Sequence, residues 1–433
     1  MPWRLVSTDP DFEERFAALL GAKREQAADV DAAVRAIVAR VRKEGDAALI
    51  ALTSQFDQLE LTPATMRVSE AEIEAAHAAT SPDTLQALSL AHDRIAAHHR
   101  RQLPKDDRYT DPIGVELGSR WTAIESAGLY VPGGTASYPS SVLMNAVPAS
   151  VAGVERIAMV VPAMRGALNP LVLTAARIAG VSEIYRIGGA QAVAALAYGT
   201  QTIAPVAKIV GPGNAFVAAA KRQVFGHVGV DMIAGPSEVL VIADGDNDPD
   251  WIAADLLAQA EHDTAAQSIL ITDDAAFADA VEAAVARQLK TLSRAETAAA
   301  SWATHGAIIV VPSLDDAAPL SDRIAPEHLE LCVADPDALS EKCLHAGAIF
   351  LGQWTPEAIG DYIGGPNHVL PTARSARFSS GLSVMDFIKR TTLARMTPDA
   401  LRAIGPSAEV LATSESLEAH GLSVTARLQK LNE

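Results

Sequence analysis

The stretch VLVIAD (residues 239–244) is a short apolar run, rich in β-branched residues, that ends at an acidic residue. A helical pattern follows it through DLLAQAEHD (255–263), and a second run of the same kind, SILITD (268–273), comes next. Buried strands separated by helices are typical of βαβ units, in which the strands are parallel. The stretch therefore predicts a parallel sheet covered by helices.

The same alternation extends to both sides of this stretch. Strand patterns occur upstream at AIESAGLYV (123–131), RIAMVVPA (156–163), EIYRIG (183–188) and KIVGPG (208–213), with helices expected near 170–180, from Gln191 and from Asn214. After a long helical pattern, further strand patterns occur at AIIVVPS (307–313), HLELCVAD (328–335) and AIFLG (348–352). The first hundred residues and the polar tail after about Gly381 have helical patterns. The sequence predicts the α/β class, with two doubly wound domains.

The composition indicates a globular protein too long for one simple core. The 433 residues are 49% hydrophobic, and 35 basic against 53 acidic residues give a net charge of −18. This acidity argues against nucleic acid or an anionic membrane as a partner, because both attract clustered positive charge. No apolar run reaches membrane-spanning length and the N-terminus lacks a signal-peptide core, so we expect a cytoplasmic protein. With only two cysteines, Cys332 and Cys343, a metal would need nitrogen and oxygen ligands.

One helix end carries polar residues at a spacing that suits a pair of metal ligands. Ile252, Leu256 and Gln259 fall on one stripe of this helix, so Gln259 continues its buried face. His262 is three residues further on and is a neighbour of Gln259 on the helix surface. The two side chains can share one cation, but local hydrogen bonding at a polar helix end explains the same spacing, and spacing alone favours it. A cap and a proline mark where the helix begins (Asn247 or Asp248, then Pro249).

Further titratable residues occur in segments that precede or follow apolar runs. APEHLEL (325–331) places Glu327 and His328 side by side; a regular strand would point them to opposite faces, whereas a turn after Pro326 would let both reach one pocket. There they could act as bases near neutral pH, or simply contact solvent at a strand edge. GDYIGGPNHVLPT (360–372) contains Asp361 and His368 around a glycine-rich turn that allows close approach of a ligand. The C-terminal tail contains Glu415 and His420 as further candidates. By itself, this segment is only a helical pattern that includes a histidine.

Four glycine-rich turns are candidate anion sites. They are YVPGGTASYPSS (130–141), GGAQAVAA (188–195), GPGNAF (211–216) and AGPSE (234–238). The second and third lead into helices whose free N–H groups suit a phosphate, although tight turns between strands and helices need glycine for steric reasons too. None matches G-x-G-x-x-G, and Phe216 stands where the third glycine belongs, so a standard dinucleotide motif is absent.

Taken together, these motifs resemble the histidinol dehydrogenase family from about residue 25 to the C-terminus. The segments that carry the resemblance occur in family order: GLYVPGGTASYPSSVLMNAVPA, GGAQAVAALAYGT, KIVGPGNAFVAAAKRQV, IAGPSEVLVIAD, DLLAQAEHD, APEHLEL, GDYIGGPNHVLPT and FSSGLSV. The resemblance implies a zinc-dependent enzyme that oxidises L-histidinol to L-histidine with two NAD⁺, the last step of histidine biosynthesis. One Zn²⁺ per subunit is implied.

The resemblance also implies roles for individual residues. Its zinc ligands match Gln259, His262, Asp361 and His420, and its catalytic pair matches Glu327 and His328. NAD-contacting positions match Tyr130, Gln191 and Asn214. Substrate-contacting positions match Ser237, Glu415 and His368, together with Gln259, His262, His328, Asp361 and His420. In this scheme His328 removes the alcohol proton, Glu327 activates water to hydrate the bound aldehyde, and the metal mainly orients the substrate.

The family's architecture implies two incomplete Rossmann-like domains in a domain-swapped homodimer. We expect an N-terminal helical segment (1–24), a first α/β domain with the zinc and catalytic residues (25–129 and 238–380), a second with the NAD-binding loops (130–237), and a C-terminal segment (381–433). That last segment would carry Glu415 and His420 to the partner subunit's site.

Three other functions remain open at the level of sequence. A related dehydrogenase could oxidise another small polyol such as a sulfopropanediol, although the retained Glu415 and His420 suit an imidazole-bearing substrate. A zinc hydrolase would use Glu327 to activate water without NAD⁺, and would leave the glycine-rich loops unexplained. A non-catalytic nucleotide sensor would not need Glu327 at all.

Overall fold

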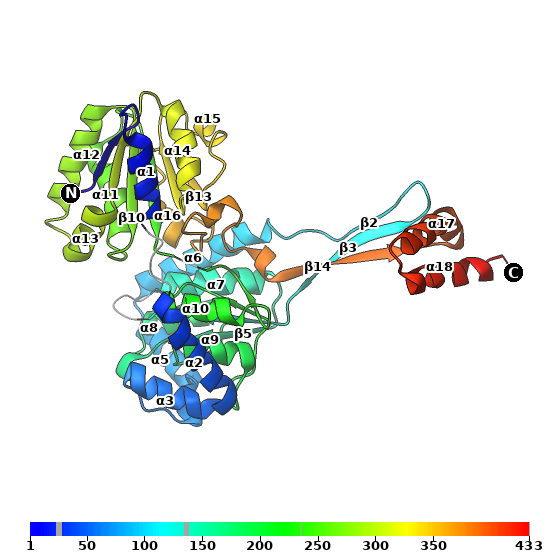
Figure 1. The fold of residues 1–433 in the computed structure, drawn as a ribbon. Coiled ribbons are helices and arrows are strands. Elements are labelled where there is room, and N and C mark those ends of the chain that lie inside the picture. Colours follow the sequence, from blue (N-terminus) through cyan, green and yellow to red (C-terminus); the bar gives the residue numbers. More distant parts are fainter. Residues whose placement is uncertain (23–27, 134–137, 234, 433) are drawn as a thin grey trace. The chain divides into compact units, whose positions relative to one another are not determined.

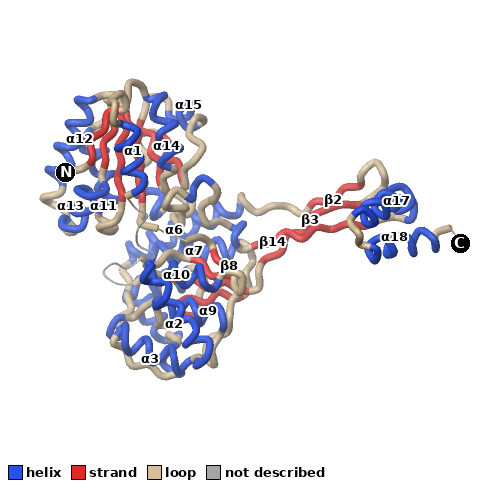
Figure 2. Tube along the Cα trace, viewed as in Figure 1, coloured by secondary structure: helices blue, strands red, loops and turns tan. Residues whose placement is uncertain are grey.

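The computed structural model describes residues 1–22, 28–133, 138–233 and 235–432. The chain forms two compact units, the first from Met1–Arg101 and Glu125–Phe387 and the second from Gln102–Ile124 and Ile388–Glu433. The first unit contains two parallel sheets with their helices, and the described residues of the second form an antiparallel sheet and the helices α17 (Pro398–Ser414) and α18 (Glu418–Lys430) (Figures 1 and 2). None of the helices in the described part of the chain combines the length and apolarity that a bilayer crossing requires.

The larger sheet has six strands, and every neighbouring pair is parallel. Across the sheet the order is β1 (Trp3–Val6), β11 (Ala307–Val310), β10 (Gln267–Thr272), β9 (Glu238–Ala243), β12 (His328–Cys332) and β13 (Ala348–Leu351). Strands β9, β10 and β12 are buried at every residue, as expected when helices cover both faces of a parallel sheet.

Each face of this sheet has its own apolar core. Leu240 and Ile242 of β9 pack with helices on one face: α1 (Phe12–Gly21), α14 (Ala317–Ile324) and α15 (Pro336–Ser340). Val239 and Val241, which alternate with them, pack with helices on the other: α11 (Pro249–Ala260), α12 (Ala275–Gln288) and α13 (Ala295–His305). The short helix α16 (Glu357–Tyr362) follows the edge strand β13. The period of two along each strand therefore produces the doubly wound arrangement.

The smaller sheet has five parallel strands. Its order is β6 (Glu183–Tyr185), β5 (Arg156–Val160), β4 (Ser126–Tyr130), β7 (Lys208–Val210) and β8 (Gly229–Val230). Helices within this segment are α7 (Pro139–Val151), α8 (Pro170–Ile178), α9 (Gly189–Tyr198) and α10 (Ala215–Val224). The N-terminal helices α2 (Ala28–Glu44) and α3 (Asp46–Asp57) share one core with α9 and α10. Helices α5 (Glu70–Ala79) and α6 (Pro82–Arg100), which follow the single turn α4 (Pro63–Met66), pack on α8 and α7.

The second unit is built from strands that are distant in sequence. Strand β3 (Glu116–Ala123) pairs antiparallel with both β2 (Asp107–Thr110) and β14 (Ile388–Arg395), in a register that runs from Ile388↔Ala123 to Arg395↔Glu116. Helices α17 and α18 pack on each other, and a Cβ atom on Gly405 of α17 would lie 3.1 Å from the side chains of Val424 and Leu428 of α18. Because β2 is exposed along its whole length, this unit has little core of its own.

The α/β class with parallel sheets is confirmed, and the strand patterns quoted above all form strands. The long helical pattern after residue 273 is two helices, α12 and α13, rather than one. Asp248 caps α11 and Pro249 begins it, as the sequence predicts.

The domain boundaries differ from those expected. Residues 1–24 are not only helical, because β1 lies at the edge of the six-stranded sheet. Helices α2 to α6, expected with the first domain, pack on the five-stranded sheet instead. The segment expected to begin at residue 381 shares its sheet with residues 107–123. The sequence of an amphipathic helix predicts which of its faces is buried. It does not predict which of the two sheets that face packs against.

Candidate functional site

A cavity of about 980 Å³ lies in the first unit and is lined by residues from both parallel sheets. The segments that follow β4 and β7, including Tyr130 and Asn214, line one side. The segments that precede β9, β10 and β12, including Ser237, His262 and Glu327, line the other. The carboxyl edge of the five-stranded sheet and the amino edge of the six-stranded sheet thus contribute to one cavity.

Glu327 and His328 reach this cavity through an irregular turn at the end of α14. Ala325 there has a left-handed φ of 47°, and β12 begins only at His328. Glu238, the first residue of β9, then holds both side chains by its backbone: its N–H donates to Glu327 Oε2 at 2.9 Å, and its carbonyl lies 3.0 Å from His328 Nδ1. Glu327 Oε2 and His328 Nδ1 are 3.8 Å apart. The turn therefore brings Glu327 and His328 into one pocket, as predicted for a turn after Pro326 rather than a regular strand.

Three imidazoles surround the carboxylate of Asp361, which lies in α16. Its oxygens are 3.7 Å from Nε2 of His328, 4.0 Å from Nε2 of His262 and 4.0 Å from Nδ1 of His368. All four residues line the cavity, although they come from the turn after α11, from β12, from α16 and from the loop after α16. The tertiary structure thus assembles a cluster of nitrogen and oxygen ligands that no local sequence motif contains.

Gln259 has a buried side chain that lacks partners. It is 0% exposed, and neither its amide oxygen nor its amide nitrogen has a hydrogen-bond partner among the described residues. Ile252 and Leu256 on the same stripe of α11 are also buried, so the predicted face is confirmed. Burying an amide without a hydrogen bond costs free energy, and such a group in a native structure points to a missing ligand or ion. Gln259 also lines the cavity.

His368 is held at both ring nitrogens. Its Nδ1 donates to the backbone carbonyl of Asp361 at 3.0 Å, and its Nε2 lies 3.2 Å from the Ser141 hydroxyl in α7. Burial lowers the pKa of His368, which therefore stays neutral near pH 7. These contacts fix the loop next to Asp361, so His368 supports the cluster as well as lining the cavity.

The site groups have perturbed pKa values with identifiable causes. Burial raises the pKa of Glu327 to about 7, although His328 and the Glu238 N–H oppose the shift. Burial alone would lower the pKa of His328, but Glu357, Glu327 and Asp361 outweigh it and raise that pKa well above its usual value. Burial would raise the pKa of Asp361, yet the neighbouring imidazoles hold it below its usual range. Glu327 therefore titrates near neutral pH, where a general base is most effective.

Sequence reasoning missed a chain of buried carboxyl groups behind His328. Glu330, two residues further along β12, is 0% exposed and its Oε1 accepts the Glu357 N–H at 2.5 Å. Glu357 Oε2 lies 4.0 Å from His328 Nδ1. Burial raises the pKa of Glu357 to about 8 and, together with Asp255, raises that of Glu330 well above its usual value. The signal in the sequence was a glutamate inside the apolar run HLELC.

The predicted coenzyme residues have different environments. Tyr130 ends β4, lines the cavity, and its hydroxyl accepts the Gly189 N–H at 3.0 Å. Asn214 lines the cavity and its side-chain oxygen caps α10 by accepting the N–H groups of Phe216 and Val217. Gln191 is buried in α9 and is not one of the described residues that line the cavity.

Glu415 and His420 belong to the second compact unit and are exposed in the single chain. Residues 134–137 and Ala234 of the glycine-rich segments lie outside the described residues. The roles expected for Glu415 and His420 therefore stay predictions, as does anion binding by the parts of the glycine-rich segments outside the described residues.

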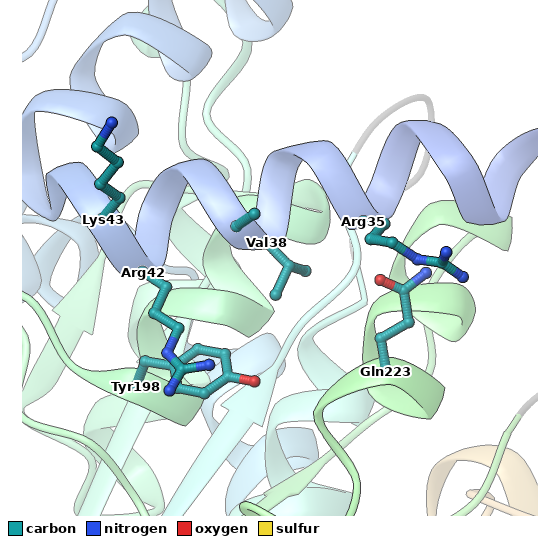
Figure 3. Close-up of a pocket in the computed structure, with 7 residues that line it drawn as sticks. Arg35, Val38, Arg42, Lys43, Tyr198 and Gln223 are labelled. Carbon is teal, nitrogen blue, oxygen red and sulfur yellow. The ribbon is translucent and has the colours of Figure 1, made fainter.

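A second cavity, of about 550 Å³, lies on the face of α2 and contains none of the predicted site residues (Figure 3). Its described lining includes three cations, Arg35, Arg42 and Lys43, all of them exposed. The guanidinium of Arg42 lies 5.0 Å from the centre of the Tyr198 ring, a cation–π contact.

The chain is similar to known proteins over its whole length. The family model described as histidinol dehydrogenase matches residues 21–428. A histidinol dehydrogenase of Ruegeria pomeroyi is 68% identical over 432 residues and one of Rhizobium meliloti is 69% identical over 428, covering at least 99% of both chains in each case. The crystal structure of histidinol dehydrogenase from Elizabethkingia anophelis superposes with a TM-score of 0.95 at 37% identity, covering 100% of this chain and 99% of that one.

Proposed function

This chain belongs to the histidinol dehydrogenase family and is an oxidoreductase, and we propose that it oxidises L-histidinol to L-histidine with two NAD⁺, the last step of histidine biosynthesis. The observation that carries this proposal is the cluster around Asp361. Three imidazoles lie within 4.0 Å of its carboxylate, in the same cavity as the partnerless amide of Gln259 and the Glu327–His328 pair. We also propose that the enzyme acts in the cytoplasm.

We propose that Gln259, His262 and Asp361 hold one Zn²⁺ per subunit, with His420 of the partner subunit completing the set. The donor chemistry fits, because imidazole nitrogen and carboxylate oxygen are common zinc ligands and a cation would satisfy the buried amide oxygen of Gln259. Burial lowers the pKa of His262, which keeps its ring neutral as a ligand requires. When bound, the metal would supply a positive charge that could orient the imidazole and amine nitrogens of the substrate.

A second group of potential ligands lies nearby, because atoms of His328, Glu357 and Asp361 fall within 4.8 Å of one another. Three observations favour the first set. His328 Nδ1 already faces the Glu238 carbonyl, and Glu357, with a pKa of about 8, is protonated near neutral pH and is a poor ligand. The amide of Gln259 would also remain without a partner if the metal were bound by the second set.

His328 is the base that we assign to the alcohol. Its Nδ1–H donates to the Glu238 carbonyl, so Nε2 is the nitrogen that gains and loses a proton and acts as the base when the ring is neutral. Nε2 is buried and has no hydrogen-bond partner among the described residues, so it is available to take the hydroxyl proton of histidinol. Bound NAD⁺ would supply the hydride acceptor for each of the two oxidations.

Glu327 is the base that we assign to the aldehyde. The N–H of Glu238 holds its Oε2, which directs the carboxyl group towards the cavity. A carboxylate with a pKa near 7 is partly deprotonated at neutral pH and can take a proton from water as that water adds to the aldehyde carbon. Oxidation of the resulting hydrate gives the acid.

The remaining contacts follow from the family positions. We propose that Tyr130, Gln191 and Asn214 contact NAD⁺, and that Ser237 and His368 contact the substrate together with the partner subunit's Glu415. Residues 130–237 would then provide the coenzyme site and residues 238–380 the metal and catalytic residues. The whole would be a domain-swapped homodimer, in which α17 and α18 serve the partner's site.

The test is a metal analysis coupled to an assay of NADH formation. We expect one zinc per subunit, two NADH for each L-histidinol consumed, and loss of turnover after verified removal of the metal. Turnover that survives complete metal removal would contradict the proposed site. Offering a sulfopropanediol in parallel separates the related dehydrogenase, and metal-dependent hydrolysis without NAD⁺ would indicate the hydrolase.

A further inference from the structure

A buried ion pair surrounds the turn that follows β7. Lys221 of α10 and Asp231, just after β8, form a salt bridge, and their side chains are 3% and 1% exposed. The Nζ of Lys221 also donates to the carbonyl of Gly211 at 3.0 Å, and the N–H of Gly211 donates to Asp231 Oδ2 at 2.7 Å. Both polar groups of one glycine are thus held by two charged side chains that are themselves paired.

Gly211 lies where the five-stranded sheet reverses its strand order. Strands β4 and β7 are neighbours there, and a Cβ atom on Gly211 would lie 2.2 Å from the Tyr130 carbonyl oxygen. The backbone has a φ of +108°, which favours glycine. In open α/β sheets, ligands bind outside the carboxyl ends of the strands at this kind of point. Gly211 therefore packs against the backbone of Tyr130 and begins the turn that leads to Asn214.

Stability alone does not account for a buried charge pair in this position. Replacing a buried ion pair by apolar residues of similar volume is often neutral or stabilising, because desolvation offsets the attraction. Lys221, Asp231 and Gly211 all line the large cavity, so the pair supports its wall. A pair that contacts both polar groups of one turn residue fixes the conformation of that turn.

We propose that Lys221 and Asp231 are positioning residues for the coenzyme: by holding Gly211, they set the turn over Gly211–Asn214 in the conformation that NAD⁺ binds. This inference rests on the proposed function, because it takes NAD⁺ as the ligand at Tyr130 and Asn214. The pair acts through the backbone of the turn and need not touch the coenzyme.

The test replaces both partners, since removing one would leave a buried charge unpaired and could unfold the protein. In Lys221→Met/Asp231→Leu we expect a melting temperature near that of the parent and unchanged zinc content. We expect KM for NAD⁺ to rise at least about tenfold, with kcat at saturating NAD⁺ and KM for histidinol within about threefold. A purely structural role would instead lower the melting temperature and change all kinetic parameters together.

The matched control is another Lys–Asp pair, located at the amino end of β7, the strand that Gly211 follows. Lys208 of β7 and Asp386 are paired at 2.8 Å and do not belong to the described lining of the cavity. We expect Lys208→Met/Asp386→Leu to leave KM for NAD⁺ unchanged. A folded Lys221→Met/Asp231→Leu protein with a KM for NAD⁺ within twofold of the parent overturns the inference.

Failure of the proposed function has a different signature. If the parent produces no NADH from histidinol, that function is wrong, and direct calorimetric binding of NAD⁺ to parent and variant still tests the pair. Parental NAD⁺ affinity in the folded double variant contradicts the positioning role, as does a parent that does not bind NAD⁺.

Discussion

At the scale of single residues, Gln259 shows how function and stability oppose each other. Its place on the buried stripe of α11 is a matter of helix periodicity, which favours an apolar side chain there. An amide that is fully buried without a partner destabilises the metal-free protein. The cost is accounted for if the amide oxygen binds a cation, and this can be measured without an activity assay.

We predict that Gln259→Leu raises the free energy of unfolding of the metal-free protein by about 1–3 kcal/mol, because it removes an unsatisfied buried group. The same change should weaken zinc binding by roughly 10- to 100-fold. Denaturant unfolding of the metal-free protein and competition with a zinc chelator measure the two effects.

Gln267 provides the control, since it is also buried but its amide donates to the His305 carbonyl at 3.2 Å. Gln267→Leu should lower stability and leave zinc affinity unchanged. If both variants behave alike, Gln259 is an ordinary core residue.

We predict that Glu327→Gln lowers the rate of aldehyde oxidation by about 10²- to 10⁴-fold while histidinol binding is largely kept. The amide oxygen can still accept the Glu238 N–H, so the local geometry should survive. Glu327 acts as a carboxylate and burial raises its pKa to about 7, so the parent's rate should rise with pH up to about 7. His328 serves the alcohol step, and because its pKa is raised well above the usual value, the rate of that step should keep rising to a higher pH.

The measurement is the pH profile of kcat with histidinal as substrate, beside calorimetric binding of histidinol. Parental rates in Glu327→Gln would support the nucleotide-sensor alternative. A pH profile that keeps its rise near pH 7 in the variant would assign that titration to another group.

At the scale of elements, β12 combines structural and chemical roles. Its amino end carries His328, and its centre carries Glu330 among fully buried apolar neighbours. Glu330 receives the N–H of Glu357 at the start of α16, the helix that carries Asp361. The strand therefore ties the catalytic pair to the helix of the metal cluster through one buried carboxyl group.

We predict that Glu330→Gln becomes more stable relative to the parent as the pH rises. Burial and Asp255 raise the folded-state pKa of Glu330 well above the unfolded value near 4.5. The stability contributed by its protonated form is thus fully present below about pH 4.5 and is lost as the pH rises through the folded pKa. Glutamine keeps the acceptor for the Glu357 N–H and has no proton to lose.

Thermal unfolding of both proteins between pH 5 and pH 9 tests this difference. The midpoint of the parent should fall below that of Glu330→Gln with increasing pH. A constant difference across this range would show that Glu330 does not titrate there.

At the scale of the whole molecule, two parallel sheets share one strand order but contribute opposite edges to the large cavity. Five strands of the larger sheet have the order β11-β10-β9-β12-β13, and the smaller sheet has β6-β5-β4-β7-β8, which is the same order relative to the chain. The smaller sheet faces the cavity with its carboxyl edge, as doubly wound sheets usually do. At the corresponding edge of the larger sheet, the segments that follow β9 and β12 are joined by hydrogen bonds: Asn247 donates to the Cys332 carbonyl at 2.6 Å and Asp244 accepts the Ala334 N–H at 2.8 Å.

We predict that two inactive variants, His262→Ala and His420→Ala, restore activity when they form one dimer. If α18 serves the partner subunit, a mixed dimer has one site with both defects and one intact site. A mixed dimer purified by two different affinity tags should then have about half the parental activity, because one of its two sites contains both His262 and the partner's His420. If each chain completes its own site, every site in the mixed dimer is defective and no activity returns.

The sequence by itself determined the alternation of strands and helices, the caps of α11, and the residue types available for chemistry, because these depend on local periodicity and side-chain structure. It also placed Gln259 on a buried face, and family motifs brought Glu327, His328 and Asp361 together as candidates. The tertiary structure decided which sheet α2 to α6 cover, that β1 joins the larger sheet, and that residues 116–123 pair with β14.

Only the tertiary structure shows three imidazoles around Asp361, the buried carboxyl groups behind His328, and the Lys221–Asp231 pair at Gly211. The physical reason is the same in each case. These contacts join residues from different elements, and their pKa values and missing hydrogen bonds arise from burial, which depends on packing between elements that no local pattern encodes.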